Sequence, residues 1–461
     1  MRSIVTSQGP HHDHLYRASG CRRHKTTPSL LRDRNIRWLL GGSMVNLIGD
    51  QFTLVALPWL VLHLTGDTLA LGGVLALLGL PRAVFILLGG AVVDRFSPQR
   101  VMMLSKHACT LLLATLAALV LLDALTLPRI GVLAFGIGLA TAFSIPAGTS
   151  ILPLVVVPAR LQAANGLLMG LRQLSFFIGP LLAGLLISWF GDGGQTSAPG
   201  AVADARGLGL VFGLDALSYA FSAWTLLRVR FAPRAVSAAG SPLIRPAQPV
   251  LAAVAEGLRC FWRDRPLRTC LLYWSAVALL ITGPVQIALP VLAASQPGLG
   301  AAALGSLLAA HGAGTLAGMV VSGARPRLRW VNLGMTILTV DALVGLLFMP
   351  MGRIGALWQG MALLLAIGLL GGYMQVTVFS WIQRRVAPAM LGRAMSVFLF
   401  IFMGLAPLSS AATGWVLRWV SLPSLFAAAG GMLPALSMLA LAVSPMRRVS
   451  DDGPASATDG V

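Results

Sequence analysis

Three charged side chains stand inside long apolar stretches, where a charge is costly unless it has a partner or a function. Asp50 and Arg82 each lie near the middle of such a stretch, and Arg172 lies about two turns into another. At ~1.5 Å per residue from one membrane face, all three have a similar depth. An Asp50–Arg82 or Asp50–Arg172 pair is therefore feasible. We expect either that Asp50 carries a proton or that a permanent ion pair fixes helix packing.

Three other polar side chains in apolar stretches are weaker candidates for proton chemistry. Asp215 and Asp341 could serve simply as hydrogen-bond partners for neighbouring helices. His311 is of a type that titrates near neutral pH. A lone histidine among small residues is more often a packing or hydrogen-bonding group, so both interpretations of His311 stay open.

The composition excludes a soluble enzyme. The chain has 461 residues, of which 56% are hydrophobic and 11% charged, whereas a soluble domain carries about 25% charged residues. It contains no H-E-x-x-H, G-x-S-x-G or G-x-x-x-x-G-K-[ST] motif, which argues against hydrolase chemistry and a built-in ATPase. The four cysteines lack metal-ligand spacing. We expect no cofactor and no metal. The stretch from His11 to His24, which includes Cys21, could bind a metal, but we favour its interpretation as part of a disordered tail.

The apolar stretches are long enough to cross a bilayer as helices, since ~20 residues span its hydrocarbon core. We predict an all-α membrane protein with about twelve transmembrane helices. The predicted spans are 37–63, 69–92, 101–122, 130–154, 165–190, 208–227, 268–293, 300–323, 330–350, 354–378, 393–418 and 423–443.

Arginine placement predicts the orientation, because basic residues collect in cytoplasmic loops. A cytoplasmic N-terminus puts most basic residues inside and leaves few outside. The inside residues are Arg32, Arg34, Arg37, Arg95, Arg100, Lys106, Arg160, Arg228, Arg230, Arg325, Arg327, Arg329, Arg384, Arg385, Arg393, Arg447 and Arg448, and the outside residues are Arg129, Arg206, Arg353 and Arg418. The basic residues that produce the net charge of +19 are thus placed as the topology of a membrane protein requires. This explanation of the charge excludes nucleic acid as a partner.

A polar middle segment divides the chain into two sets of six spans. We predict a cytoplasmic, disordered tail over 1–35, six-helix halves over 36–228 and 268–444, a cytoplasmic linker over 229–267, and a cytoplasmic tail over 445–461. The second part of the linker reads as an amphipathic helix, with Phe261 and Trp262 at the membrane interface. Two such halves commonly place a substrate site between them at mid-membrane.

The connection between the second and third spans carries the sharpest motif. It contains Gly90, Asp94, Arg95 and Arg100, and it resembles the signature loop of the major facilitator superfamily. The resemblance implies that Asp94 caps the eleventh span near residues 391–393, where a carboxylate meets the positive end of a helix. Breaking that contact would accompany gating. The superfamily usually has Gly at the position of Ser97 and a basic residue at 98 or 99.

Further stretches are similar to the twelve-helix drug:proton antiporter branch, which includes macrolide efflux pumps and the enterobactin exporter. They are Gly49-Asp50, Ala56–Leu60, Asp215–Ser218, Glu256–Arg259, Phe261–Arg263 and Gly392–Ser396. The likeness covers about residues 35–445. It implies that spans three, six, nine and twelve lie outside the central cavity.

The fifth span contains Gly179, Pro180 and Gly184, which resemble the antiporter motif of drug exporters and favour export over uptake. The other interpretation is ordinary packing, because Pro180 can kink a helix and small residues permit close helix contact. Small-xxx-small pairs also occur at 166/170 and 314/318.

We hypothesise proton-coupled efflux of a hydrophobic or amphipathic molecule, such as a drug, macrolide or siderophore. The expected partners are this small molecule, protons and the lipid bilayer; the expected location is a bacterial cell membrane. Apolar walls with a few polar groups suit such a ligand. Candidate cavity residues are Trp59, Met169, Phe176, Phe177, Tyr273, Trp274, Gln286, His311, Met374 and Gln375.

Other functions remain open from the sequence. One is uptake or flipping of a lipid-like solute. Another is an intramembrane enzyme or a sensor, although no sizeable soluble segment is available to carry a signal. The sequence does not define an oligomeric state.

Overall fold

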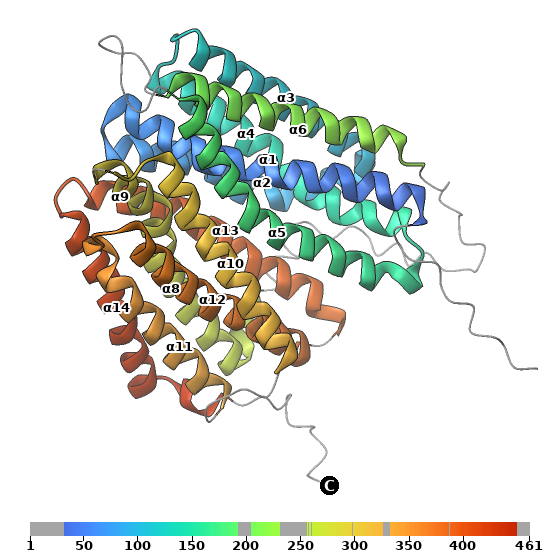
Figure 1. Ribbon diagram of the computed structural model, residues 1–461. Coiled ribbons are helices and arrows are strands. Elements are labelled where there is room, and N and C mark those ends of the chain that lie inside the picture. Colours follow the sequence, from blue (N-terminus) through green and yellow to red (C-terminus); the bar gives the residue numbers. More distant parts are fainter. Residues whose placement is uncertain are drawn as a thin grey trace, which may run out of the picture.

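The computed structural model describes most of the chain between residues 32 and 449 (Figure 1). The described residues are 32–191, 204–230, 256, 258–259, 261–296, 298–325, 332–386 and 388–449. Within helices, the side chains at 86–91, 94, 158–159, 388–389, 391–394, 396, 399–400 and 448 are outside this description. Residues 1–31 and 450–461 of the predicted tails, and most of the linker, also lie outside it.

The described chain is all-helical, as predicted. The first half consists of α1 (Arg34–Thr65), α2 (Thr68–Phe96), α3 (Pro98–Leu121), α4 (Leu127–Val155), α5 (Pro158–Phe190) and α6 (Ala205–Arg228). The second half consists of α8 (Arg265–Gly283), η2 (Pro284–Ala288), α9 (Leu289–Ser295), α10 (Ala301–Ala324), α11 (Leu333–Phe348), η3 (Met349–Arg353), α12 (Leu357–Arg385), α13 (Pro388–Val416), α14 (Leu422–Val443) and η4 (Pro445–Arg448).

Eleven described helical segments are long and apolar enough to cross a membrane. The seventh consists of α8, η2 and α9 together, and α13 corresponds to the eleventh predicted span, which is not among these eleven segments. Side-chain caps fix several starts: Asp33, Asp67 and Asn332 accept hydrogen bonds from the backbone N–H groups of Asn35, Leu69 and Met335. Such caps satisfy amides that have no partner within the helix.

Two helix pairs hold the halves together. Helix α5 packs on α10, and α2 packs on α13, whereas α3 packs mainly on α4 and α6 within its own half. The same holds for α11, which packs mainly on α14 and α12. The sixth and twelfth spans, α6 and α14, also pack mainly within their own halves, and the position of these four spans outside a central cavity stays an expectation from the resemblance.

The halves meet closely at the end of the molecule where α1 ends and α2 begins, here called the α1–α2 end. Thr68 Oγ1 donates a hydrogen bond to the carbonyl of Gly414 over 2.9 Å, and Arg418 lies 3.7 Å from Asp67. Gly184 of α5 lies against Gly305 of α10 so closely that a Cβ on either residue would overlap the opposite backbone.

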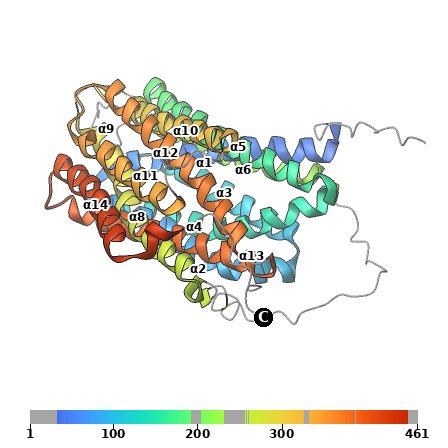
Figure 2. The ribbon, with the colours of Figure 1, turned by 90° about the horizontal axis from the view of Figure 1, so that it is seen from below.

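The halves separate at the opposite end, the α2–α3 end. There the helices of the two halves diverge in both views (Figures 1 and 2). A Cβ added to Gly166 or Gly170 of α5 would meet nothing within 4 Å, and Met169 is 61% exposed. The conformation is therefore closed at the α1–α2 end and open at the α2–α3 end.

Two sequence predictions about polar and aromatic residues are wrong. Lys106, expected near a cytoplasmic loop, is the ninth residue of α3 and is 8% exposed. Phe261, expected at the membrane interface, is 1% exposed and belongs to the hydrophobic core with Leu267 and Cys270. Its neighbour Trp262 is 51% exposed. The segment just before α8 therefore packs against the hydrophobic core through Phe261. The amphipathic pattern did not predict this contact.

Candidate functional site

A buried polar cluster lies between α1, α3 and α6. Its centre is Asp50 of α1, whose Oδ1 accepts a hydrogen bond from the Tyr219 hydroxyl over 2.7 Å. The Asn46 amide, one helical turn earlier, donates to the same oxygen over 3.2 Å. Because the carboxyl group sits among apolar helices, these donors compensate part of its lost hydration.

Lys106 connects α3 to this cluster. Its Nζ donates to Asn46 Oδ1 over 2.6 Å and to Ser222 Oγ over 2.7 Å. The ammonium group also lies 5.6 Å from the centre of the Tyr219 ring. One amide side chain therefore links a buried cation to a half-buried carboxylate. This arrangement gives Asn46 a fixed orientation, with its oxygen toward Lys106 and its nitrogen toward Asp50.

Asp215 of α6 forms the second acidic part of the cluster and is 1% exposed. Thr53 donates to its Oδ2 over 2.5 Å, and Ser218 donates to its Oδ1 over 3.1 Å. A Cβ at Gly49 would overlap Ser218, so the glycine lets α1 approach α6. Both carboxyl oxygens have partners, which fits the hydrogen-bonding role expected for Asp215.

The two candidate arginines act on Asp50 at a distance. The electrostatic field at its carboxyl group comes from Arg82, Lys106 and Arg172, in decreasing order. In the described part of the chain, no ion pair within 4 Å joins Asp50 to either arginine. Arg82 Nε instead donates to Thr141 Oγ1 over 3.1 Å, and Arg172 is exposed on α5. The direct Asp50–arginine pair considered from the sequence is therefore not formed in this conformation, and the role of these charges stays a prediction.

The predicted gating motif is mostly helical. Gly90 and Asp94 lie in the last turns of α2, and Ser97 alone connects α2 to α3. Arg95 and Arg100 are exposed. The side chain of Asp94 and those at 391–393 lie outside the described residues, so the predicted cap stays a prediction. Ser97 has a φ of +74°, a backbone region that favours glycine, and this is the position where the superfamily usually has Gly.

The antiporter-like motif lies at helix contacts. Gly179 faces Gln51 of α1, and a Cβ there would lie 2.5 Å from the Gln51 Cβ. Gly184 faces α10, and the Pro180 carbonyl faces Gly305. Helix α5 continues through Pro180 from residue 158 to residue 190. These residues therefore set how closely α5 approaches α1 and the opposite half.

The small-residue pairs behave differently in the two halves. A Cβ at Gly314 or Gly318 of α10 would overlap the α12 backbone, so these glycines pack as predicted. Gly166 and Gly170 of α5 have open space beside them. The difference follows from the separation of the halves at the α2–α3 end.

The candidate cavity residues do not form one group. Trp59 is buried, and its Nε1 donates to Asp204 Oδ2 over 3.4 Å. Gln286 accepts a hydrogen bond from Ser410 over 2.9 Å, between η2 and α13. The other residues range from buried to exposed: Tyr273, Trp274 and Met374 are buried, Phe176 and His311 are half-buried, and Met169, Phe177 and Gln375 are exposed.

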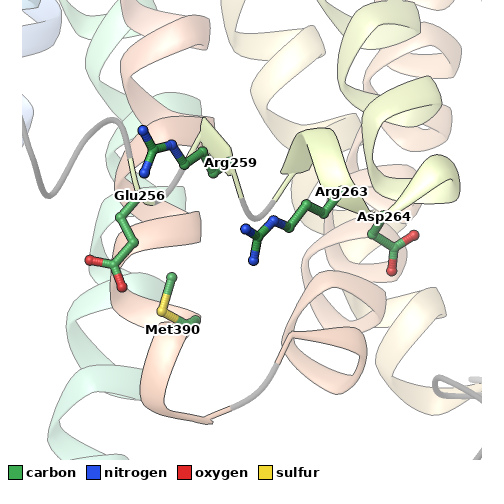
Figure 3. Close-up of a pocket in the computed structure, with 5 residues that line it drawn as sticks. All are labelled: Glu256, Arg259, Arg263, Asp264 and Met390. Atoms are coloured by element: carbon green, nitrogen blue, oxygen red, sulfur yellow. The ribbon is translucent and has the colours of Figure 1, made fainter.

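The described residues form at least two hollows. One, of about 770 Å³, lies at the α2–α3 end, between the segment before α8 and the start of α13. Figure 3 shows its lining residues Glu256, Arg259, Arg263, Asp264 and Met390. Asp264 is held there by Arg385, whose Nε donates to Oδ2 over 2.8 Å. The second hollow, of about 300 Å³, is an apolar groove between α5, α10 and α12.

Sequence reasoning did not assign Lys106, Tyr219 or Asn46 to the site. Lys106 is eight residues after the proline that begins α3, about 12 Å along the helix axis. That depth was the available signal. Tyr219 and Asn46 carried no such signal, because single neutral polar residues are common in membrane helices. No group of three His, Cys, Asp or Glu side chains suited to a metal occurs in the described residues, and His11–His24 lie outside them.

Comparison with known proteins identifies the family. A family model described as Major Facilitator Superfamily matches residues 39–410. The chain belongs to the major facilitator superfamily. It is thus a transporter of small molecules rather than an enzyme, and a multi-pass protein of the cell membrane.

Individual members of the superfamily show the range of similarity. The multidrug efflux pump Tap of Mycobacterium tuberculosis is 27% identical over 432 residues, covering 89% of this chain and 94% of Tap. Among solved structures, the nucleoside transporter NupG has a TM-score of 0.67 at 13% identity, covering 90% of this chain and 100% of NupG. An inward-facing, unoccupied bacterial homologue of the human lysosomal transporter Spinster has a TM-score of 0.62 at 16% identity, covering 91% and 96%. At these identities, the structures support the fold alone.

Proposed function

We propose that this transporter exports hydrophobic or amphipathic small molecules in exchange for protons, and that Asp50 carries the exchanged proton. The observation that carries the proposal is the Asp50 environment. A half-buried carboxyl group on a helix that contacts both halves has two hydrogen-bond donors and three nearby cations. Export as the direction is supported by similarity to proteins named multidrug efflux pumps.

The mechanism depends on how Asp50 is neutralised in each state. A buried carboxylate can lose its charge by binding a proton or can be balanced by nearby cations. In this conformation Tyr219 and Asn46 hold Oδ1, while Lys106 holds Asn46. Arg82 and Arg172 belong to the same half as Asp50 and move with it when the halves rock, whereas the contacts of α1 with α9 and α10 change, and with them the access of water to Asp50. The proton affinity of Asp50 then differs between the two open states, as exchange requires.

The orientation of the chain in the membrane determines which side the open end faces. Basic residues gather at the α2–α3 end, so the positive-inside rule makes this end cytoplasmic. The described conformation is then inward-open, ready to take a molecule from the cytoplasm or the inner leaflet. The orientation can be tested with a cysteine substituted for the exposed residue Arg100. Intact cells carrying this variant are treated with a thiol reagent that does not cross the membrane. Labelling from outside without permeabilisation would overturn it.

The test of exchange is proton release from energised inverted vesicles on adding macrolides, tetracyclines and siderophores. We expect at least one compound class to trigger release from vesicles with wild type, and no release with Asp50→Asn. Asp67→Asn is the matched control, because it makes the same change at a partly exposed helix cap that bonds to the Leu69 N–H group and lies past the end of α1, far from Asp50. Unimpaired release by Asp50→Asn would refute the assignment of Asp50. If no compound triggers proton release from vesicles that contain wild type, the result would count against drug export.

A further inference from the structure

The second half contains a buried carboxyl group of its own. Asp341 lies on α11, and its Oδ2 is buried without a hydrogen-bond partner. The Tyr273 side chain of α8 interacts with the other part of this carboxyl group. The Tyr273 hydroxyl also shares a hydrogen bond of 2.9 Å with Ser437 Oγ of α14. The carboxyl group therefore sits where α8, α11 and α14 meet, among neutral partners.

The equivalent place in the first half is occupied differently. Asp341 is the ninth residue of α11, and Lys106 is the ninth residue of α3. Each helix is the third span of its half. Lys106 lies one amide away from Asp50, so its charge is balanced. Asp341 faces a tyrosine at the corresponding depth.

Cations on the elements around Asp341 are too far away to balance a negative charge. The elements packed on α11 are α12, α14, η3 and η4. Their titratable or charged residues in the described chain are Tyr373, Arg384 and Arg385 of α12, Arg353 of η3 and Arg447 of η4, and α14 has none. Arg353, Arg384 and Arg447 lie at helix ends, about 12 Å or more from the level of Asp341 along the helix axes, and Arg385 pairs with Asp264. Tyr273, with Cys270 beyond it, faces the site from α8.

An ionised carboxylate with an unpartnered oxygen is very costly away from water. A bound proton removes that charge and lets the group remain among neutral side chains. We propose that Asp341 is a proton-binding site that keeps its proton throughout transport, and that this resident proton holds α8, α11 and α14 together. The site is separate from Asp50, because α11 packs within its own half and Oδ2 is closed off while the halves stand apart at one end.

Infrared spectroscopy of the purified, detergent-solubilised protein tests the proton directly. A protonated carboxylic acid has a carbonyl stretching band that a carboxylate lacks. We expect wild type at neutral pH to show one acid band that is absent from Asp341→Asn and present in Thr339→Val, a control on the same helix whose side chain bonds only to the Met335 carbonyl. Identical acid bands in wild type and Asp341→Asn would overturn the proposal. If Asp341→Asn fails to fold, Tyr273→Phe should shift the band, and an unshifted band would contradict the proposal.

Thermal unfolding as a function of pH gives a second readout. An unfolded chain releases an Asp proton well below neutral pH, so the folded protein binds one more proton. Stability then falls as the pH rises toward the value at which folded Asp341 ionises. Relative to Asp341→Asn, the melting temperature of wild type should drop as the pH rises from about 5 through neutral pH. Equal drops would show that Asp341 is already ionised.

Measuring proton-coupled transport shows whether the proton on Asp341 stays in place or is transported. Asp341→Asn should retain compound-dependent proton release, within about twofold of wild type, whereas loss of coupling with normal folding would show that the Asp341 proton moves. These results do not depend on the role proposed for Asp50. If wild type shows no coupled release at all, the infrared and melting comparisons still decide whether Asp341 holds a proton.

Discussion

Lys106 on α3 and Asp50 on α1 are joined through a single side chain, the Asn46 amide, which accepts from one at 2.6 Å and donates to the other at 3.2 Å. This link places a cation and an anion of the same half in one hydrogen-bonded unit inside the membrane. Charge-assisted hydrogen bonds of this kind are stronger than neutral ones. Protonation or deprotonation of Asp50 should therefore change the hydrogen bond between Asn46 and Lys106.

Replacing Lys106 with Gln should alter the pH dependence of transport. A neighbouring positive charge favours the carboxylate over the acid, so without it the transport profile should move toward alkaline pH. Lys106→Arg keeps the charge and should largely restore the wild-type profile. Compound-dependent proton release measured across pH gives the result, and an unchanged profile in Lys106→Gln would show that Lys106 acts only in packing.

Tyr219→Phe removes one donor from Asp50 and leaves the ring in place. Loss of a hydrogen bond to a charged group costs about 1.5–3 kcal/mol. If the bond is stronger in one protonation state, transport should slow by roughly tenfold while the fold persists. Initial transport rate and melting temperature should be measured together, with Tyr273→Phe in the other half as the matched substitution. Equal slowing in both variants would argue against a specific role for Tyr219.

Gly184→Val should favour the conformation that opens at the α1–α2 end. The added Cβ would overlap the α10 backbone at Ala301 and Gly305, which strains the closed contact. Spin labels placed on α5 and α10 near this end should move apart in the variant. Gly170→Ala is the control, because its Cβ meets nothing within 4 Å. A Gly184→Val distance distribution identical to that of the control would mean that the contact does not determine the conformation.

The Asp67–Arg418 pair should matter less than this glycine contact. Its side chains are 39% and 50% exposed at a separation of 3.7 Å, and exposed ion pairs are worth about 0–1 kcal/mol. Arg418→Gln should thus change the same spin-label distances only slightly. A shift as large as that of Gly184→Val would show that the pair is the principal closure of this end.

Ser97→Gly should stabilise the protein. Ser97 holds a φ of +74° between α2 and α3, which costs a non-glycine residue about 1 kcal/mol or more. The variant should melt a few degrees higher in detergent, and Ser105→Gly in the interior of α3 should melt lower. A lower melting temperature for Ser97→Gly would mean that the serine side chain contributes more than the backbone strain costs.

The sequence predicted the helices better than the side-chain contacts. Apolar length determines where a chain crosses a bilayer, so each predicted span corresponds to a helix or helical segment near the same bounds. The charge rule also placed most arginines at helix ends. It misplaced Lys106 because it weighs a basic residue by its nearness to a span boundary, whereas contacts with Asn46 and Ser222 from α1 and α6 make burial favourable.

Contacts between distant helices could not be obtained from spacing. Depth along each span brought Asp50, Arg82 and Arg172 to one level, and all three do interact electrostatically. Depth does not give the rotation of a helix about its axis, however. This rotation turns Asp50 toward Tyr219 on α6 and turns Trp59 toward Asp204. The same limitation explains why the candidate cavity residues spread over buried and exposed positions.

The most direct test of proton exchange at Asp50 is the number of protons moved per compound molecule in reconstituted liposomes containing a pH-sensitive dye. A compound that triggers release in vesicles would serve as the probe, with wild type, Asp50→Asn and Asp50→Glu compared at equal protein content. We predict opposed movement of protons and compound by wild type, compound movement without protons by Asp50→Asn, and partial recovery of coupling by Asp50→Glu. Proton movement by Asp50→Asn at the wild-type ratio would contradict the account.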